Sequence, residues 1–346
     1  MVKKVLLYLF LCLCLTAATY SEDVTLGRMK LTLHEGIGRF SPYYLTEIRA
    51  EEYLPLFVAE DPRTSYISVS LDNRVYRLGD SGLFSLDTDI SSDRAVFTWK
   101  SSEITVRQEF RFITSPNASL ADGIKMDITL TNISEKAVSA GVRLLIDTYL
   151  GEDSNLHFIT KETSGISGEK TVVPSADQTF WISKENRQAK TGLRWEIYGT
   201  GITSPDKVIF ANWKRLTETP WEYETNTGRN FNLLPYSIND SAAAVYYNPS
   251  RLETGKSRTI SIVFGNAADE GFALADNADS DVFNNLAAQE TSETDEFTLQ
   301  GDLIALNDLI ARINDLLESD AEITQDQIEV LTRALSRLEQ RKPNYE

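Results

Sequence analysis

Cysteine is almost absent from the chain. The two cysteines, Cys12 and Cys14, both lie within the first 21 of 346 residues. That stretch opens with two lysines, continues as apolar and small residues from Val5 to Ala18 and ends in small residues, an order typical of a secretory signal peptide. As a helix the apolar run would be ~21 Å long, too short to span a bilayer. We therefore predict that residues 1–21 are a cleaved signal.

Export through this signal predicts a periplasmic protein, with the cell surface or secretion as alternatives. Removal of the signal would leave no cysteine, so we expect neither disulfides nor thiol chemistry in the mature chain. We also expect no transmembrane span after cleavage. A chain of this length can bury a core large enough to fold without disulfides.

Basic residues are also scarce. The chain has 34 lysines and arginines and 51 acidic residues. Lys3 and Lys4 belong to the signal, so cleavage would leave an excess of 19 negative charges. Such a surface repels phosphate backbones and anionic membranes, so we expect no nucleic-acid partner. A basic protein, a cation or a neutral glycan remains compatible with this charge, and solubility alone explains much of it.

Histidine and the common catalytic motifs are scarce as well. His34 and His157 are the only histidines, and without cysteine a transition-metal site would need both of them plus carboxylates. We predict that each has a structural or surface role, and we predict no metal and no cofactor. Residues 165–171, GISGEKT, lack the Gly-Lys pair of a phosphate loop, and no G-x-S-x-G nucleophile motif is present.

What the chain does have is strand patterning. From Ile124 to Leu130, apolar residues alternate with polar ones, the two-residue period of a strand with one buried face. After a polar turn at 132–136, Val138 to Leu150 is too apolar to face water on either side. We interpret these two segments as a hairpin on which the other strands pack.

Further strands surround this segment. Short turns predict hairpins at Asp72-Asn73 and at Lys100-Ser101-Ser102, and one strand with a glycine interruption is expected from Val24 to His34. About a dozen strands without helical patterning between them indicate a mainly β fold. We predict a large antiparallel two-sheet sandwich, a supersandwich, over residues 22–266.

The composition changes after this domain. Ten acidic residues and no basic one fall between Asp269 and Asp302, so 267–298 is predicted to be a solvated acidic linker. The apolar spacing then becomes 3.5 residues, which predicts a C-terminal αα-hairpin at 299–342. Its apolar seam indicates packing on the sandwich, self-association or a helix-mediated protein partner.

Candidate ligand-binding residues follow from charge and aromatic placement. Arg143 and Asp147 are expected on one face of an apolar strand. We interpret them either as a structural ion pair or as the floor of a ligand cleft. Further candidates come from the polar turns Asp61-Pro62-Arg63 and Asn239-Asp240-Ser241 and from an aromatic loop with Trp213 and Trp221. The full set is Asp61, Arg63, Arg143, Asp147, Trp213, Trp221 and Asp240, and no catalytic residue is assigned.

Several runs carry a resemblance to a known class. VRLLIDTYLGED, the Asp-Pro-Arg-Thr turn, FANWKRL with Trp221 downstream, and DSAAAVYYNPSRLETGKSRTISIVFG resemble exported bacterial proteins of the spirochaete periplasmic type. Their β-domain is similar to the supersandwich of the galactose mutarotase-like, carbohydrate-associated group. The resemblance covers about residues 24–266 and implies the fold. It does not imply mutarotase activity, because neither LTLHEGIG at His34 nor SNLHFIT at His157 matches the mutarotase histidine motif.

Three functions remain open from the sequence. The first is a non-catalytic periplasmic binding or scaffolding module whose ligand is a glycan or an envelope protein. The second is a carbohydrate-active enzyme, epimerase-like or lyase-like, that uses carboxylates such as Asp147 and Asp240. The third is a purely structural envelope protein. A surface that gathers carboxyls with aromatic rings would favour the first two over the third.

Overall fold

The computed structural model describes most of the predicted β-domain and little beyond it. The described residues are 21–47, 50–90, 95–116, 118, 120–268 and 271–272, with Leu306, Ile310, Thr332 and Ser336. The predicted signal lies outside this part except for Ser21. The predicted linker beyond residue 272 and the predicted helical hairpin also lie outside it, except for those four residues, which are helical. No helix within the described part is both long and apolar enough to cross a membrane.

The described chain is mainly β, in three sheets. A four-stranded sheet has the order β1 (Ser21–Leu26), β2 (Met29–His34), β3 (Arg39–Glu47), β4 (Glu52–Pro55). An eight-stranded sheet has the order β12 (Ile159–Thr160), β14 (Phe180–Ser183), β15 (Leu193–Glu196), β18 (Ser257–Asn266), β10 (Gly123–Asn132), β9 (Ile104–Ile113), β8 (Ala95–Lys100), β7 (Ser85–Ile90). A six-stranded sheet has the order β13 (Lys170–Val172), β16 (Lys207–Asn212), β17 (Ser241–Leu252), β11 (Val138–Asp147), β5 (Tyr66–Leu71), β6 (Arg74–Arg77).

All pairings between these strands are antiparallel, as predicted. The expectation of two sheets was incomplete, because the N-terminal residues form a third. The chain predicted as one strand from Val24 to His34 turns back at Gly27, whose φ is +59°. A Cβ at this glycine would lie 2.4 Å from the backbone nitrogen of Ala121, so both the turn and the close approach require glycine.

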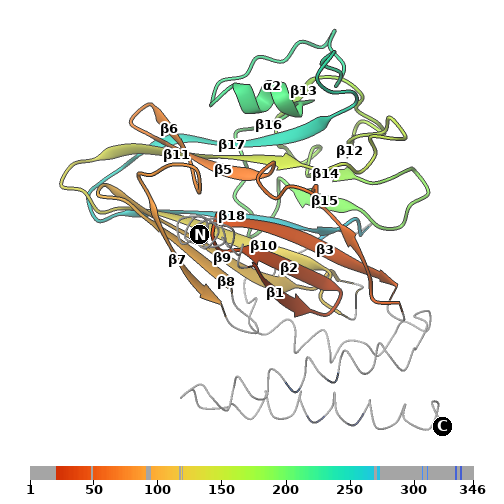
Figure 1. Cartoon of the computed structure of the whole chain (residues 1–346), viewed down its shortest axis with the longest axis horizontal. Helices are drawn as coiled ribbons and strands as arrows, with labels where there is room; N and C mark the ends of the chain where they lie inside the picture. Colours follow the sequence, from red (N-terminus) through yellow and green to blue (C-terminus); the bar gives the residue numbers. More distant parts are fainter. Residues whose placement is uncertain are drawn as a thin grey trace, which may run out of the picture.

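The main core lies between the eight-stranded and six-stranded sheets. Figure 1 shows β11, β17 and β5 in one layer and β18, β10 and β9 in the layer facing it. Alternate residues of each strand enter the shared core, among them Met126, Ile128 and Leu130 from one sheet and Val142, Leu144 and Ile146 from the other. The four-stranded sheet joins the same core through Phe40, whose ring lies 4.8 Å from that of Phe110.

The predicted central hairpin was wrong, although both of its strands exist. β10 pairs with β9 and β18, whereas β11 pairs with β5 and β17 in the other sheet. The chain therefore crosses the core between them. Asn132, fully buried at this corner, donates from Nδ2 to the carbonyls of Lys136 and Leu252, which links the crossing to the end of β17. The hairpins at Asp72-Asn73 and at Lys100-Ser101-Ser102 are confirmed.

A short helix covers the outer face of the six-stranded sheet. The sequence reading missed α2 (Trp213–Glu218), which begins where the Asn212 side chain accepts from the backbone N–H groups of Lys214 and Arg215. Figure 1 shows α2 on the side of β16 and β17 away from the eight-stranded sheet. Beneath the helix and the segment that follows it lies a second apolar cluster, with Tyr66, Leu145, Ile209, Ala211, Leu216, Ala242, Ala244 and Tyr246. We call α2 and the segment that follows it, up to residue 232, the cover. It explains why β11 and β5 are buried on both faces.

Arg143 fixes this cover to the sheet. Its side chain, 1% exposed, donates to the carbonyls of Leu216 at 2.8 Å, Thr219 at 2.9 Å and Pro220 at 3.1 Å. Its guanidinium carbon also lies 5.4 Å from the ring centre of Tyr246. A cation at the C-terminal end of a helix satisfies carbonyls that have no partner within the helix. Arg143 therefore closes α2 onto the sheet.

Arg143→Ala should lower the free energy of unfolding by ~3–5 kcal/mol, because it leaves a cavity and three carbonyls without their donor. Urea unfolding followed by tryptophan fluorescence measures this. Arg251→Ala is the matched control, since Arg251 is 75% exposed and bonded to Glu253, and it should leave the free energy of unfolding almost unchanged. Equal, small effects of the two substitutions would show that Arg143 does not hold the cover.

Candidate functional site

The seven predicted ligand-binding residues fall into two groups. Arg143 and Trp221 lie at the contact between the sheet and its cover, where the Trp221 ring packs edge-on against Tyr246 at 6.0 Å. The other five, Asp61, Arg63, Asp147, Trp213 and Asp240, lie around one end of the six-stranded sheet. Within the described residues Arg143 and Asp147 form no ion pair, although they share a face of β11. The interpretation of these two as a structural ion pair was therefore wrong.

The antiparallel register brings this end of the sheet together. Asp147 pairs with Ala242 and Asn212 pairs with Ser241, so β11 and β16 end where β17 begins. β5 begins beside them, because Leu145 pairs with Tyr66. The segments 56–65, 148–158 and 232–240 and the start of α2 consequently meet at one place. Trp213 connects two of them, since its backbone N–H donates to the Asp240 carbonyl and its ring N–H to the Thr64 carbonyl.

Asp147 is a buried acid at this end of the sheet, with 5% of its surface exposed. Its carbonyl accepts from the N–H of Val58, and its own N–H donates to the Ser65 hydroxyl, which attaches the 56–65 segment. Burial raises the pKa of its carboxyl to about 7, and the charges of Asp240, Asp61 and Glu60 add to this, against a hydrogen bond from Thr64. The carboxyl is therefore half protonated near neutral pH.

Glu152, which the sequence reading missed, lies beside Asp147 and Asp240. Its Oε1 accepts from the N–H of Ser241 at 2.8 Å. Burial raises the pKa of Glu152 to about 8, with the charges of Asp147 and Asp240 adding to the effect of burial. Burial also raises the pKa of Asp240, against a hydrogen bond from Ser237. Glu152 and Asp240 are both half-buried. We call Asp147, Glu152 and Asp240 the sheet-end acids.

Ser241, whose N–H donates to Glu152, also contacts His157. The His157 Nδ1 is 2.9 Å from the Ser241 Oγ, and its Nε2 is 3.3 Å from the Asn155 Oδ1. The ring packs edge-on against Phe231 at 4.5 Å, and burial lowers its pKa to about 4. Because Ser241 and His157 are 0% and 1% exposed, the pair is not presented to solvent as a nucleophile and base. Both ring nitrogens have partners, which fits a structural histidine.

The backbone around the sheet-end acids is strained. Asn155, His157 and Asn239 all have positive φ, at 54°, 45° and 54°. Residues other than glycine adopt this region only where the surrounding structure imposes it, and such residues cluster at functional sites. Asn239 lies next to Asp240, and Asn155 and His157 follow Glu152 by three and five residues. Three strained residues beside three acids with raised pKa values mark this end as the candidate site.

Asp61 and Arg63 form an exposed pair at the rim of this end. The guanidinium of Arg63 donates from Nε and Nη2 to the two carboxyl oxygens of Asp61, each at 2.8 Å. These hydrogen bonds lower the pKa of Asp61. Asp61 therefore stays ionised, and its charge is one of those that raise the pKa of Asp147. The predicted turn at Asp61 exists, since Thr64 donates from its N–H to the Asp61 carbonyl.

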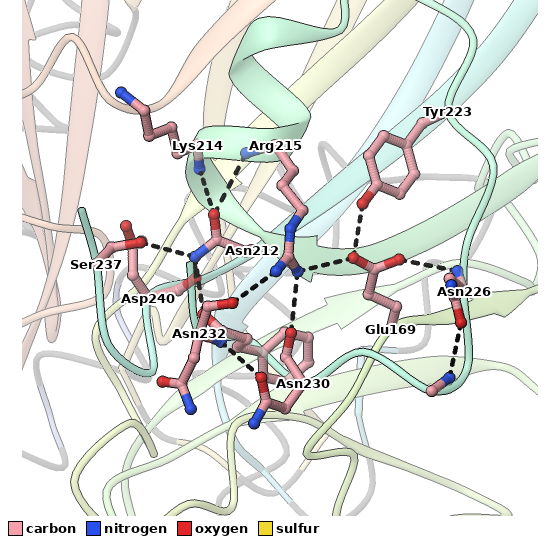
Figure 2. A network of polar contacts seen from close by, with 12 residues as sticks. Glu169, Asn212, Lys214, Arg215, Tyr223, Asn226, Asn230, Asn232, Ser237 and Asp240 are labelled. Carbon is pink, nitrogen blue, oxygen red and sulfur yellow. Dashed lines mark hydrogen bonds and ion pairs between the residues drawn. The ribbon is translucent and has the colours of Figure 1, made fainter. Parts of the chain in front are cut away.

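A second buried acid, Glu169, has a structural environment. Figure 2 shows its carboxylate between Arg215, at 2.9 Å, the Tyr223 hydroxyl, at 2.7 Å, and the backbone N–H of Asn226, at 2.9 Å. Burial and the Glu169 carboxylate raise the pKa of the Tyr223 hydroxyl. These contacts hold the 219–232 segment of the cover against α2. Glu169 is thus occupied by its own neighbours, in contrast to the sheet-end acids.

No metal centre is evident within the described ranges, where no three His, Cys, Asp or Glu side chains are grouped so that they could hold an ion. The remaining histidine, His34, is half-buried on β2, where its Nε2 lies 3.0 Å from the Ser41 hydroxyl. Burial lowers its pKa, against the charge of Asp23.

Comparisons with known proteins give fold likeness only. No protein-family model matches the sequence, and no curated protein matches it. Among solved structures, a galactose mutarotase-like protein from Lactobacillus casei has a TM-score of 0.43 and 10% identity over 71% of this chain and 100% of its own. A galactose mutarotase related enzyme from Lactobacillus acidophilus has a TM-score of 0.39 and 8% identity over 73% and 99%. A heparan sulfate lyase mutant from Pedobacter heparinus has a TM-score of 0.32 and 9% identity over 71% and 34%. The chain is thus similar in structure, at low identity, to galactose mutarotase-like β-supersandwich proteins.

The sheet-end acids should make stability fall between about pH 6.5 and about pH 8. In this window the folded protein holds protons on Asp147 and Glu152 that the unfolded chain, with ordinary pKa values of 3.8 and 4.5, has released. The stabilising protonation is therefore lost as the pH rises through about 7 and about 8. Below pH 6.5, His157 acts in the opposite direction, because the unfolded chain binds a proton that the folded one does not.

Urea unfolding at half-unit pH steps measures this slope. The double variant Asp147→Asn/Glu152→Gln should flatten it between about pH 6.5 and about pH 8, while Asp177→Asn, on an exposed turn, should leave it unchanged. A wild-type stability that is constant across this window would contradict the raised pKa values. So would an unchanged slope in the double variant.

Proposed function

We propose that this chain is a non-catalytic, exported binding module that recognises a neutral glycan at the sheet-end acids. The observation that carries the proposal is the pair of half-buried carboxyls, Glu152 and Asp240, beside buried Asp147. With a pKa of about 8, Glu152 retains its proton at neutral pH. A protonated carboxyl both donates and accepts hydrogen bonds, which matches the hydroxyl groups of a sugar.

Aromatic side chains near the acids support a sugar ligand. Tyr149 follows Asp147 by two residues, is 39% exposed and experiences the charge of Glu60, as Asp147 does. Trp213, half-buried, lies between Thr64 and Asp240. Rings with an apolar face and a polar tip pack against sugar rings, while a few placed polar groups fix the orientation of the ligand.

The charge of the chain narrows the ligand class. The charges of Asp61 and Glu60 would repel an anionic ligand, and the chain as a whole carries a net charge of −17. A neutral glycan avoids this repulsion. In the proposed setting the protein acts in the periplasm after cleavage of residues 1–21, with the cell surface or secretion as alternatives.

A second candidate is a carbohydrate-active enzyme that uses the same acids for proton transfer. Its support is that the pKa values of Asp147 and Glu152, about 7 and about 8, lie where a general acid or base works best. We rank it below binding because Asp147 is 5% exposed and its N–H and carbonyl are fixed by Ser65 and Val58. Turnover of any bound sugar, followed by NMR, would reverse this ranking.

Titration calorimetry with neutral oligosaccharides of glucose, galactose and N-acetylglucosamine tests the proposal. Glu152→Ala should weaken binding at least tenfold. Glu152→Gln, which keeps a donor and an acceptor, should retain most of the affinity. Wild-type affinity should fall as the pH rises through about 8, where Glu152 ionises, and Glu152→Gln should reduce that fall.

The control is Asp177→Ala, which should bind like the wild type. Absence of binding to every oligosaccharide at pH 6 would contradict the proposal. So would an affinity that Glu152→Ala leaves unchanged, or one that Asp177→Ala lowers equally.

A further inference from the structure

The Ser241 hydroxyl lies between His157 and Glu152, and it has one proton to donate. Its Oγ is 2.9 Å from Nδ1 of His157 and 3.5 Å from Oε1 of Glu152. The ring nitrogen and the carboxyl oxygen can both accept, but a hydroxyl donates to one of them at a time. The direction of this hydrogen bond therefore decides whether the hydroxyl acts on Glu152 as a donor or as an acceptor.

The second ring nitrogen of His157 determines that direction. Its Nε2 is 3.3 Å from Oδ1 of Asn155, an oxygen that only accepts hydrogen bonds, so Nε2 carries a proton. Burial lowers the pKa of His157 to about 4, so at pH 7 the ring is neutral and has a single N–H. Nδ1 is then an acceptor, and the Ser241 hydroxyl donates to it.

The distances agree with this direction. The separation of 2.9 Å from His157 suits a hydrogen bond, whereas 3.5 Å to Glu152 is longer than O–H···O bonds usually are. A hydroxyl that donated to Glu152 would lower the pKa of the carboxyl, but here its proton points to His157. Ser241 instead turns an oxygen lone pair toward Oε1, and this disfavours the ionised carboxylate.

The backbone of Ser241 acts on the same carboxyl oxygen. Its N–H donates to Oε1 of Glu152 at 2.8 Å. In a neutral carboxyl the carbonyl oxygen is the better acceptor, so the acidic proton lies on the other oxygen, Oε2. No hydrogen bond within the described part of the chain reaches Oε2, and Glu152 is half-buried. Oε2 can therefore donate its proton to a ligand.

We infer that Ser241 is a positioning residue for Glu152, held in its orientation by His157 and Asn155. Its N–H occupies Oε1, and its lone pair keeps the carboxyl neutral, so that Glu152 presents Oε2–H to the glycan as a hydrogen-bond donor. This inference rests on the proposed function and narrows it, because the sugar must place an acceptor oxygen at Oε2.

Nitrogen NMR of the histidine rings tests the hydrogen-bond direction without any glycan. In wild-type protein with nitrogen-15-labelled histidine, at pH 7, His157 should be the neutral tautomer with its proton on Nε2. His34→Gln removes the other histidine of the chain and so assigns the signals. A proton on Nδ1 would overturn the inference, because the Ser241 hydroxyl could then donate to Glu152.

Ser241→Ala tests the effect on Glu152, because it removes the hydroxyl and keeps the N–H. Asp147, at the end of β11, and Asp240, before β17, also raise the pKa of Glu152, and both stay in place in this variant. Carboxyl NMR should show the Glu152 midpoint, near 8 in the wild type, shift to lower pH. A shift to higher pH would show that the hydroxyl donates to Glu152, and an unchanged midpoint would show that it has no effect on the carboxyl. Either result would overturn the inference.

Ser41→Ala is the matched control, because it changes the other serine–histidine pair. Ser41 is 3% exposed, and its hydroxyl lies 3.0 Å from Nε2 of His34. This variant should leave the Glu152 midpoint and the His157 tautomer as they are in the wild type. An equal shift of the midpoint in both serine variants would overturn the assignment to Ser241. If Ser241→Ala does not fold, the tautomer in the wild type remains the deciding measurement.

Glycan binding separates this inference from the proposed function. For an oligosaccharide that binds the wild type, the pH at which half of the affinity is lost should fall in Ser241→Ala together with the Glu152 midpoint. Absence of binding to every oligosaccharide would contradict the proposed function, whereas both NMR results would still stand. Binding to a protein whose His157 carries its proton on Nδ1 would leave the glycan site and remove the role of Ser241.

Discussion

The hydrogen bonds of Arg143 to the end of α2 determine which surfaces of the six-stranded sheet are covered. A guanidinium taken out of water must find acceptors, and here it finds three carbonyls on the segment that crosses the outer face of the sheet. Glu169 anchors the same segment from the other side, through Arg215 and Tyr223. The central strands β11 and β5 are therefore buried on both faces, by the main core and by the cover. The proposed ligand site lies at the end of the sheet and not on either face.

At that end of the sheet, burial raises the pKa values of carboxyl groups. Asp147 is the last residue of a strand that is buried on both faces, and the Glu152 carboxyl accepts from the N–H of Ser241. Removal from water and mutual repulsion raise the pKa values of both, so these acids stay partly uncharged where exposed acids such as Asp61 are ionised. A small group of neutral carboxyls on a strongly acidic chain is the feature on which the proposed glycan site rests.

Local patterns in the sequence predicted local structure. Alternation placed most strands, turn residues placed two hairpins, and the apolar run of β11 correctly predicted a strand buried on both faces. The sheet to which each strand belongs could not be predicted, because β10 and β11 carry equally good core faces and β11 pairs only with β5 and β17, which are distant in sequence. At the candidate site, Asp147 and Arg143 were predicted because they are charged residues in an otherwise apolar strand. Their different roles depend on α2, and Glu152 carried no signal because Asp240 and Ser241, which lie beside it, are distant in sequence.

The most direct test of this account is the titration of the carboxyl groups themselves. Carbon-13 NMR of the side-chain carboxyls in labelled protein, recorded from pH 3 to pH 9, should show two resonances with midpoints near 7 and 8. One should disappear in Asp147→Asn and the other in Glu152→Gln. The Asp61 carboxyl, whose pKa is lowered by its hydrogen bonds with Arg63, should titrate at lower pH. If every carboxyl titrated below pH 5, the sheet-end acids would be ordinary solvated anions, and the basis for a neutral-ligand site would be gone.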